Sequence, residues 1–286
     1  MVNRLADFRT ILWVLIYISL MVIQWMHWAN HWAIYGLTLY FAFACKVIVH
    51  NHLHIPTMKP GWNGIFSWLL AVSTMTTLQF AYAVHVENHH RDHMTEEDRF
   101  GVLGYSGRWG LWEVMLCPLW FISNFVRSGK AKAIIQKWNR SRRWRQTELK
   151  LHSISIYCLA IGLLIINPAN TLLYFVVPNL ITIWMIIQTN HFQHIGCSGE
   201  SDYTHARTII NPISNWLLFN SGFHLAHHLN PRLHWQDLRR YHFSEVAQHV
   251  PPQIVHNSIL GCIYTLYLKT LFVRHGVYLK NPFDLS

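Results

Sequence analysis

Two long apolar runs dominate the pattern of hydrophobic and polar positions along the chain. The runs Thr10–Cys45 and Leu151–Gly199 contain no aspartate, glutamate, lysine or arginine. A helix needs roughly 20 apolar residues to cross a bilayer, so each run is long enough for two helices. Each run also has a polar break, at 29–31 and at 167–170, where a tight turn belongs. The pattern therefore predicts two helical hairpins.

The expected membrane spans follow from these breaks. We expect helices near residues 11–28, 32–50, 153–167 and 171–190. A kink is expected in the fourth, because Pro178 has no backbone N–H to donate within the helix.

Three further apolar segments fit helices that lie along the membrane surface. Gly64–Val84 is apolar enough for a fifth span, but a crossing there would move the following histidines to the opposite side from the others. We therefore expect an interfacial helix in this segment. Leu111–Phe125 and Ile259–Val273 are also expected to be interfacial, and Lys269 argues against a crossing by the latter.

Basic residues predict the orientation of the spans. The segment 127–150 carries many cations and a single acidic residue, Glu148, while Arg4 and Arg9 precede the first span. Cytoplasmic loops are enriched in lysine and arginine, so both regions are expected on the cytoplasmic side. Spans two and four then return to the cytoplasm near His50–His54 and Asn190–His194.

The composition strengthens the membrane assignment. Hydrophobic residues make up 52% of the 286 residues and charged residues only 13%, whereas soluble domains are about one quarter charged. The net charge of +10 lies beside apolar spans, so anionic lipid headgroups or an acidic redox partner are expected rather than nucleic acid. The 21 histidines are an excess that points to metal binding.

Four clusters hold the histidines that matter most for chemistry. They read HxxxH at 50–54, HxxxHH at 85–90, NxxxH at 190–194 and HxxHH at 224–228. Residues at i and i+4 share one face of a helix, so each cluster can present two groups to one metal site. A single HxxxH is a weak signal, but HxxxHH and HxxHH beside neighbouring membrane spans strongly favour a metal.

The ligand types narrow the choice of metal. The sequence has no HExxH, the zinc-protease arrangement, and too many histidines for one tetrahedral zinc. Nitrogen-rich ligation of more than one ion is typical of iron or copper. The Glu-x-x-His pattern of soluble di-iron bundles is absent from these clusters.

The order of these clusters resembles the membrane fatty acid desaturase/hydroxylase superfamily, from about His50 to Pro231. The segment His227–Pro231 looks like the third histidine box of that superfamily, and Asn190–Gly196 resembles its additional histidine segment. The resemblance implies one all-α integral-membrane domain over residues 1–286. It would comprise four transmembrane helices in two hairpins, interfacial helices and a cytoplasmic histidine-rich cap.

The resemblance also implies a ligand set. Nine histidines would hold two irons, with no catalytic residue beyond these ligands, and Asn190 would reach an iron through water. The nine are His50, His54, His85, His89, His90, His194, His224, His227 and His228.

Three other histidines are weaker candidates. His52 lies about 200° round the helix from His50 and is not expected to be a ligand. His93 and His191 are alternative ligands or groups that support the ligands. Ligating histidines need a partner for their second ring nitrogen, and Glu87 and Asp92 fit that role. For Glu96, Glu97 and Asp98 a solvated acidic loop fits equally well.

The function implied by the resemblance is O₂-dependent oxidation of an alkyl C–H bond in a lipid. Desaturation is favoured over hydroxylation of a fatty acyl, alkane or carotenoid-like substrate, although the HxxxH and HxxxHH spacing is similar to that of alkane monooxygenases. No cytochrome b5 motif is visible, so electrons are expected from a separate ferredoxin- or cytochrome-type donor. A histidine-rich metal transporter and a structural metal protein are the alternatives from other classes, and the substrate and regiochemistry stay open.

Overall fold

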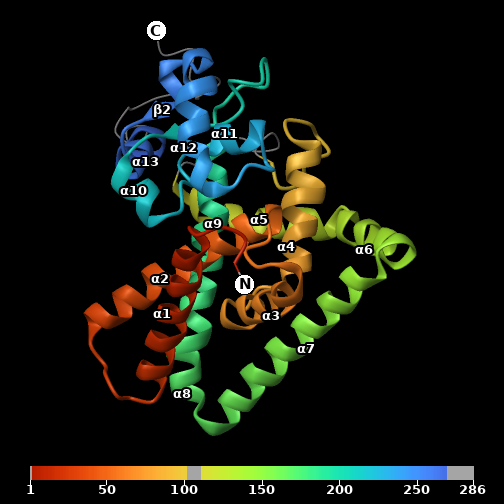
Figure 1. The fold of residues 1–286 in the computed structure, drawn as a ribbon, viewed down its shortest axis with the longest axis vertical. Helices are drawn as coiled ribbons and strands as arrows, with labels where there is room; N and C mark the ends of the chain where they lie inside the picture. Colours follow the sequence, from red (N-terminus) through yellow and green to blue (C-terminus); the bar gives the residue numbers. More distant parts are fainter. Residues whose placement is uncertain (1, 102–110, 269–286) are drawn as a thin grey trace. The chain divides into compact units, whose positions relative to one another are not determined.

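The computed structural model describes residues 2–101 and 111–268, and these are mostly helical (Figure 1). Their contacts group into two compact units: unit 1 comprises Met1–Val86 and Gly129–Ile186, and unit 2 comprises Glu87–Ser128 and Ile187–Ser286. Four helical stretches in the described part are long and apolar enough to cross a membrane. This agrees with the number of spans predicted from the apolar runs.

The first two of these helices lie side by side in unit 1. Helix α1 covers Asp7–Trp25 and α2 covers Trp32–His54. The indole of Trp13 donates to the Tyr40 hydroxyl at 3.2 Å, and the buried Thr38 hydroxyl donates to Gln24 at 2.5 Å. These bonds pair polar groups that would otherwise be costly to bury among apolar neighbours.

The second apolar run also forms two helical stretches. Helix α7 covers Arg143–Ile166, and Pro168–His194 comprises α8 (Pro168–Thr171), the π-helical turn η2 (Leu172–Val176) and α9 (Val177–His194). Asn167 ends α7, and its side chain accepts from the backbone N–H of Asn170 to begin α8. Helix α7 begins earlier than expected because the basic segment before the apolar run is also helical. The wide turn η2 lies directly before Pro178, where the missing N–H disturbs the regular α-helical bonding.

The two connections between these helices contact each other within unit 1. Trp25 donates to the hydroxyl of Thr171 at 3.0 Å, and the Asn170 amide donates to the Trp25 carbonyl at 2.7 Å. The ring of His27 hydrogen-bonds with Asn170 at 2.8 Å. Both turns therefore lie at the same end of the α1, α2, α7 and α8 group, as Figure 1 shows.

The segment between α2 and the second histidine cluster forms two helices with a sharp bend. Helix α3 covers Pro60–Ser73, α4 covers Leu78–Val84, and the helix Leu78–His90 runs at 86° to α3. At the break, the buried Lys46 side chain donates to the Thr74 carbonyl and to the Thr76 hydroxyl. The apolar segment is thus broken rather than one continuous helix.

The basic segment forms helix α6, Lys130–Ser141, whose apolar residues Ile134 and Trp138 are buried. Arg145 at the start of α7 lies 3.7 Å from the ring centroid of Tyr82, which α4 contributes. Helices α6, α7 and α4 contact one another in unit 1.

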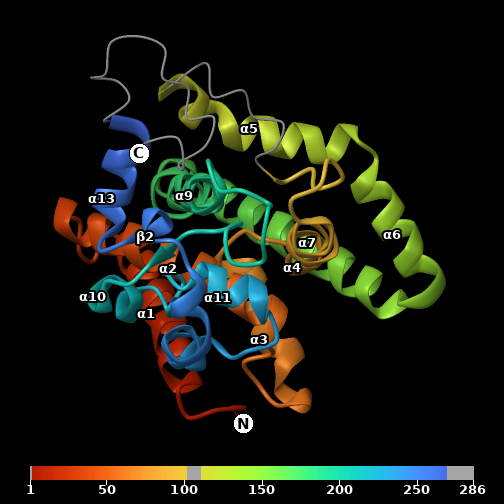
Figure 2. The same cartoon turned by 90° about the horizontal axis from the view of Figure 1, so that it is seen from above.

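The described part of unit 2 contains one longer helix, α5, several short helices and one small parallel sheet. Strand β1 (Thr208–Ile209) pairs with β2 (Val255–His256). The helical elements are α5 (Leu111–Arg127), α10 (Pro212–Leu217), α11 (His224–Leu229), η3 (Trp235–Asp237), α12 (Leu238–Tyr241), η4 (His242–Val246), η5 (Ala247–His249), η6 (Pro252–Ile254), α13 (Ile259–Ile263) and η7 (Tyr264–Leu268). Figure 2 gives the view from above. The expected interfacial helix Ile259–Val273 corresponds to α13 and η7, and its last residues, 269–273, lie outside the described part of the chain.

A close backbone approach sets the start of α11 in unit 2. The Ile209 amide donates to the Gly222 carbonyl at 2.8 Å, and the Gly222 amide donates to the Asn215 side chain at 3.0 Å. A Cβ atom at Gly222 would come 2.4 Å from the Ile209 carbonyl oxygen. Only glycine fits here, and the contact fixes where His224 begins its helix.

A buried histidine in the unit 2 core predicts acid sensitivity. His242 is 2% exposed, its ring lies tilted against that of Phe223 with 5.1 Å between the centroids, and burial lowers its pKa below 6.5. The unfolded chain therefore binds the proton more readily, so stability present above pH 6.5 is lost as the pH falls below it. We expect His242→Gln to reduce this slope in thermal unfolding measured between pH 5 and 7. An unchanged slope would contradict this assignment, and substitution of the exposed His249 is the control.

Candidate metal centre

Four histidines from three segments of unit 2 converge in a buried group. They are His89 of the π-helical turn η1 (His85–His90), His194 at the end of α9, and His224 and His228 of α11. One ligand atom from each lies within 4.8 Å of the other three. His89, His194 and His224 are at most 5% exposed.

Hydrogen bonds between neutral imidazole rings cannot account for all of the nitrogen contacts in this group. The Nε2 atom of His224 lies 2.8 Å from Nε2 of His194 and 3.1 Å from Nε2 of His228. His194 donates from Nδ1 to the His205 carbonyl at 2.9 Å, so its neutral ring has only a lone pair at Nε2. One proton on His224 cannot then serve two full hydrogen bonds. A cation would satisfy all three, since ligands about 2.1 Å from one ion lie on the order of 3 Å apart.

In two of these histidines, the Nδ1 nitrogen has a hydrogen-bond partner that fixes the ring. His194 donates to a backbone carbonyl, and the Nδ1 atom of His89 lies 2.9 Å from Oδ2 of the buried Asp98. Metal-ligating histidines use such partners to fix the tautomer and the orientation of the ring. The residues present therefore fit a metal site of imidazole nitrogens.

The end of α9 is held by the buried arginine Arg207, which is 2% exposed. Its guanidinium donates to the Phe192 carbonyl at 3.1 Å and to the Ile195 carbonyl, and its backbone amide donates to the Gln193 carbonyl at 2.8 Å. The last carbonyls of a helix have no partner within the helix. Arg207 satisfies them and so fixes the turn that carries His194.

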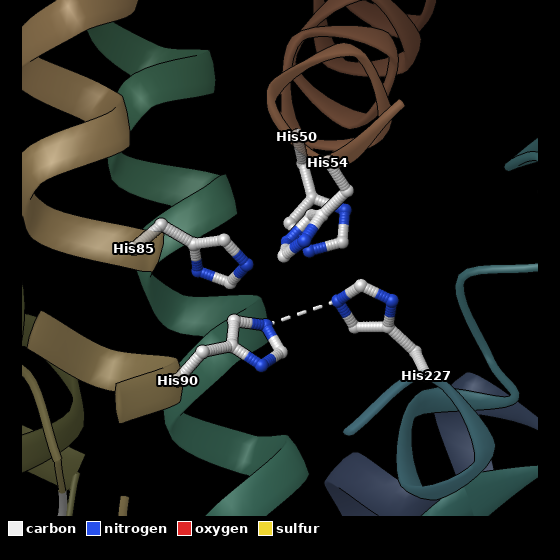
Figure 3. A group of neighbouring side chains, drawn as sticks. All are labelled: His50, His54, His85, His90 and His227. Atoms are coloured by element: carbon white, nitrogen blue, oxygen red, sulfur yellow. Dashed lines mark hydrogen bonds between the residues drawn. The ribbon is translucent and has the colours of Figure 1, made fainter. Parts of the chain in front are cut away.

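Another group of imidazoles lies in unit 1. The rings of His50 and His54, one turn apart on α2, face the ring of His85 (Figure 3). Ring centroids are 4.4 Å apart for His50 and His85 and 5.1 Å apart for His54 and His85. Three imidazoles in this arrangement can hold one metal ion and leave further coordination positions open.

Unit 2 contains one further imidazole pair, drawn with a dashed line in Figure 3. The Nε2 atoms of His90 and His227 are 3.1 Å apart. Together with the two groups above, this pair accounts for all nine histidines implied by the resemblance.

The second histidine cluster divides between two of these groups. A spacing of four residues can bring His85 and His89 to one site, but His89 joins His194, whereas His85 joins His50 and His54. The spacing rule holds for regular α-helical winding, whereas η1 is π-helical and its bonds join residues five apart.

Two imidazoles of unit 2, His228 and His205, are held in the neutral form that binds metals. Burial lowers the pKa of His228 well below its ordinary value, and the neighbouring rings of His90 and His224 lower it further. Burial likewise lowers the pKa of His205. A neutral imidazole offers a lone pair to an ion without first losing a proton.

The weaker candidates lie as follows. His52 hydrogen-bonds with Thr57 at 3.0 Å and with Ser67 at 2.8 Å and lies outside the metal-binding groups of the described residues. His191 also lies outside these groups. Asn190 is buried one turn before His194, and its amide lies 3.5 Å from the Phe100 carbonyl. A water-mediated iron contact by Asn190 stays a prediction.

The sequence did not identify two residues that the structure places beside the candidate ligands. His205 lies in the loop before β1 and joins a group with His93 and His228, yet no periodic spacing connects it to the four clusters. Asp98 fitted a solvated loop equally well, but it is the carboxylate that pairs with His89. Asp92, expected in that role, contacts Asn88 at 2.9 Å instead.

Asp98→Asn is expected to weaken metal binding about 10- to 100-fold. Asp98 accepts from His89 through one oxygen and from the Phe100 amide through the other, whereas asparagine has a single acceptor oxygen. Titration of the metal-free protein with Co²⁺ against a competing chelator would measure the change. Asp92→Asn is the matched control, and equal affinities of the two variants would show that Asp98 does not support the site.

Comparison with known proteins gives a family. The family model described as "Fatty acid desaturase" matches residues 8–257, which include every histidine group described above. No curated protein and no solved structure matches the chain. Because the match covers most of the chain, the protein belongs to the fatty acid desaturase family.

Proposed function

We propose that this protein is an O₂-dependent di-iron enzyme that desaturates an alkyl chain of a lipid. Its family consists of lipid-modifying oxidoreductases of the desaturase/hydroxylase superfamily. The observation that carries the proposal is the convergence of the Nε2 atoms of His194, His224 and His228 on one point. A cation would satisfy all three nitrogens of this arrangement, and nitrogen-rich ligation favours iron.

The proposed ligands are the nine histidines of the sequence clusters, with two irons between them. Asp98 and the His205 carbonyl orient two of these rings, and Asn190 reaches an iron through water. When bound, the two irons would supply the reduction of O₂ that lets an unactivated C–H bond be oxidised.

The overall reaction determines which co-substrates the enzyme needs. Desaturation takes one O₂, two electrons and two protons, removes two hydrogen atoms from neighbouring carbons and gives one alkene and two waters. The electrons come from a separate ferredoxin- or cytochrome-type donor. The basic segment 127–150 has the charge to attract an acidic donor.

The membrane placement is part of the proposal. We place α1 with α2, and α7 with α8 and α9, as two hairpins of one membrane domain over residues 1–286, with the histidines on the cytoplasmic side. Contacts between the two turns support a common end for both hairpins. Only 11% of the apolar window of α7 is buried, and a surface of this kind suits lipid. An apolar substrate would reach the site from the bilayer.

The test is lipid mass spectrometry of cells that express the protein with its reductase chain under ¹⁸O₂. The expected result is a lipid lighter by two hydrogens and without ¹⁸O, absent from cells that express His89→Ala. His249→Ala, which changes an exposed histidine of unit 2, should behave like the wild type. Activity that survives His89→Ala would overturn the ligand set.

Hydroxylation is the second candidate, because the HxxxH and HxxxHH spacing is similar to that of alkane monooxygenases. The same experiment separates the two reactions. A product that contains one ¹⁸O atom as an alcohol would replace the desaturase assignment with a hydroxylase one.

A further inference from the structure

Two imidazoles outside the nine-histidine set lie beside the buried group of unit 2. His93 lies in the turn that follows η1, and His205 lies in the loop between α9 and β1. The ring centroid of His93 is 4.7 Å from that of His205 and 4.5 Å from that of His228. One ligand atom from each of the three lies within 4.8 Å of the others, so they too could hold an ion.

Three of the four ring nitrogens of these two histidines are buried without a hydrogen bond. Both nitrogens of His93 and Nε2 of His205 have no hydrogen bond, and the carboxylate oxygen of Asp98 is 3.9 Å from Nδ1 of His93. His205 also has a hydrogen bond with the backbone of Ser201, which leaves Nε2 as its open nitrogen. A polar atom buried without a partner destabilises the fold unless something else binds it. A metal ion would bind these nitrogens.

The backbone directly after His93 is strained, which indicates that the position of His93 has a function. Met94 has φ +56, in the left-handed region that a residue with a side chain rarely adopts. Its side chain packs close to Gly199, where a Cβ atom would lie 3.2 Å from the Met94 terminal carbon. Such strain persists where the surrounding structure requires it, and it concentrates at functional sites. Here it turns the chain directly after His93.

His228 connects the two groups. It belongs to the group with His93 and His205 and also to the buried group with His89, His194 and His224. The His93 side chain is 14% exposed and that of His89 is 0% exposed, so His93 is the more accessible of the two. An ion held at the first group could therefore pass to the second by exchanging ligands while it remains bound to His228.

We propose that His93, His205 and His228 form an accessory site that takes up a divalent transition-metal ion and passes it to the buried group. The proposal rests on the metal centre of the proposed function and adds a route by which that centre is loaded. His93 and His205 are ligands during loading, and they are not ligands in the final centre.

The experiment uses the full-length protein in detergent, stripped of metal by a chelator and then mixed with Co²⁺. The visible absorption of bound Co²⁺ gives the loading rate, and elemental analysis gives the final metal content. His93→Gln and His205→Gln are expected to load at least about tenfold more slowly than the wild type and to reach the same content. His249→Gln, an exposed histidine of the same unit, is the matched control. Thermal unfolding checks that each variant is folded.

Two results would overturn the accessory site. Loading rates equal to that of His249→Gln would show that the two histidines take no part, and a lower final content would make them permanent ligands. Failure of the proposed function is distinguishable from both. Wild-type protein that loads Co²⁺ but leaves lipids unchanged would remove the enzymatic assignment alone, and wild-type protein that binds no metal would remove both proposals.

Discussion

Replacing His224 by alanine is expected to release metal from the buried group and to lower lipid oxidation by more than about 100-fold. Loss of a residue that merely supports a ligand costs metal affinity about 10- to 100-fold, so loss of a ligand should cost more. His224 is the ring whose Nε2 contacts both His194 and His228. Elemental analysis of the purified protein and mass spectrometry of its lipid products would measure the two effects.

The control for this change is His249→Ala, which removes an exposed imidazole from the same unit. Metal content and product yield should stay at the wild-type level in this variant. His224→Ala protein that unfolds at the control temperature and retains its full metal content would refute the assignment of His224 as a ligand.

Arg207→Ala is expected to be the most destabilising single change outside the imidazoles. It removes two hydrogen bonds from a charged donor to buried carbonyls, each contributing about 1.5–3 kcal/mol, so the free energy of unfolding should fall by about 3–6 kcal/mol. For a chain of this size the unfolding temperature should fall by at least about 6 °C. Tryptophan fluorescence during thermal unfolding in detergent would measure the shift.

Two further variants serve as comparisons for Arg207→Ala. Arg207→Lys keeps the charge but cannot reach both carbonyls with a planar group, so about half of the loss is expected. Arg240→Ala removes an arginine whose side chain is 83% exposed and lies 3.6 Å from Asp237, and it should change stability by less than about 0.5 kcal/mol. If Arg207→Ala were as stable as Arg240→Ala, the carbonyls of α9 would not depend on Arg207.

The membrane helices could be predicted from the sequence because bilayer thickness fixes the length of an apolar run. Helix α2 ends at His54, at the first histidine cluster, and α9 ends at His194. The sharp break between α3 and α4 could not be predicted in the same way. The buried carbonyl of Thr74 at the break accepts from Lys46, which lies 28 positions earlier in the chain, and the local apolar content does not reveal that contact.

The grouping of the candidate ligand histidines was predictable where a regular α-helix carries them. His50 with His54 and His224 with His228 each lie in one group, as a spacing of four residues requires. Asp98 and His205 were not predictable, because a carboxylate nine residues from His89 and an imidazole eleven residues from His194 meet their partners through irregular turns. Tertiary contacts decide such positions, and spacing alone does not encode them.

The π-helical turn at His85–His90 makes the length of this segment a functional quantity. A regular α-helix over the same residues, with about 100° per residue, would turn His90 to about 140° from His85, whereas a π-helical turn takes about one residue more and keeps the two directions closer. Every imidazole would still be present in the α-helical form, yet His90 would point away from its present partner. A natural variant shortened by one position here should therefore wind as a regular α-helix and keep its activity.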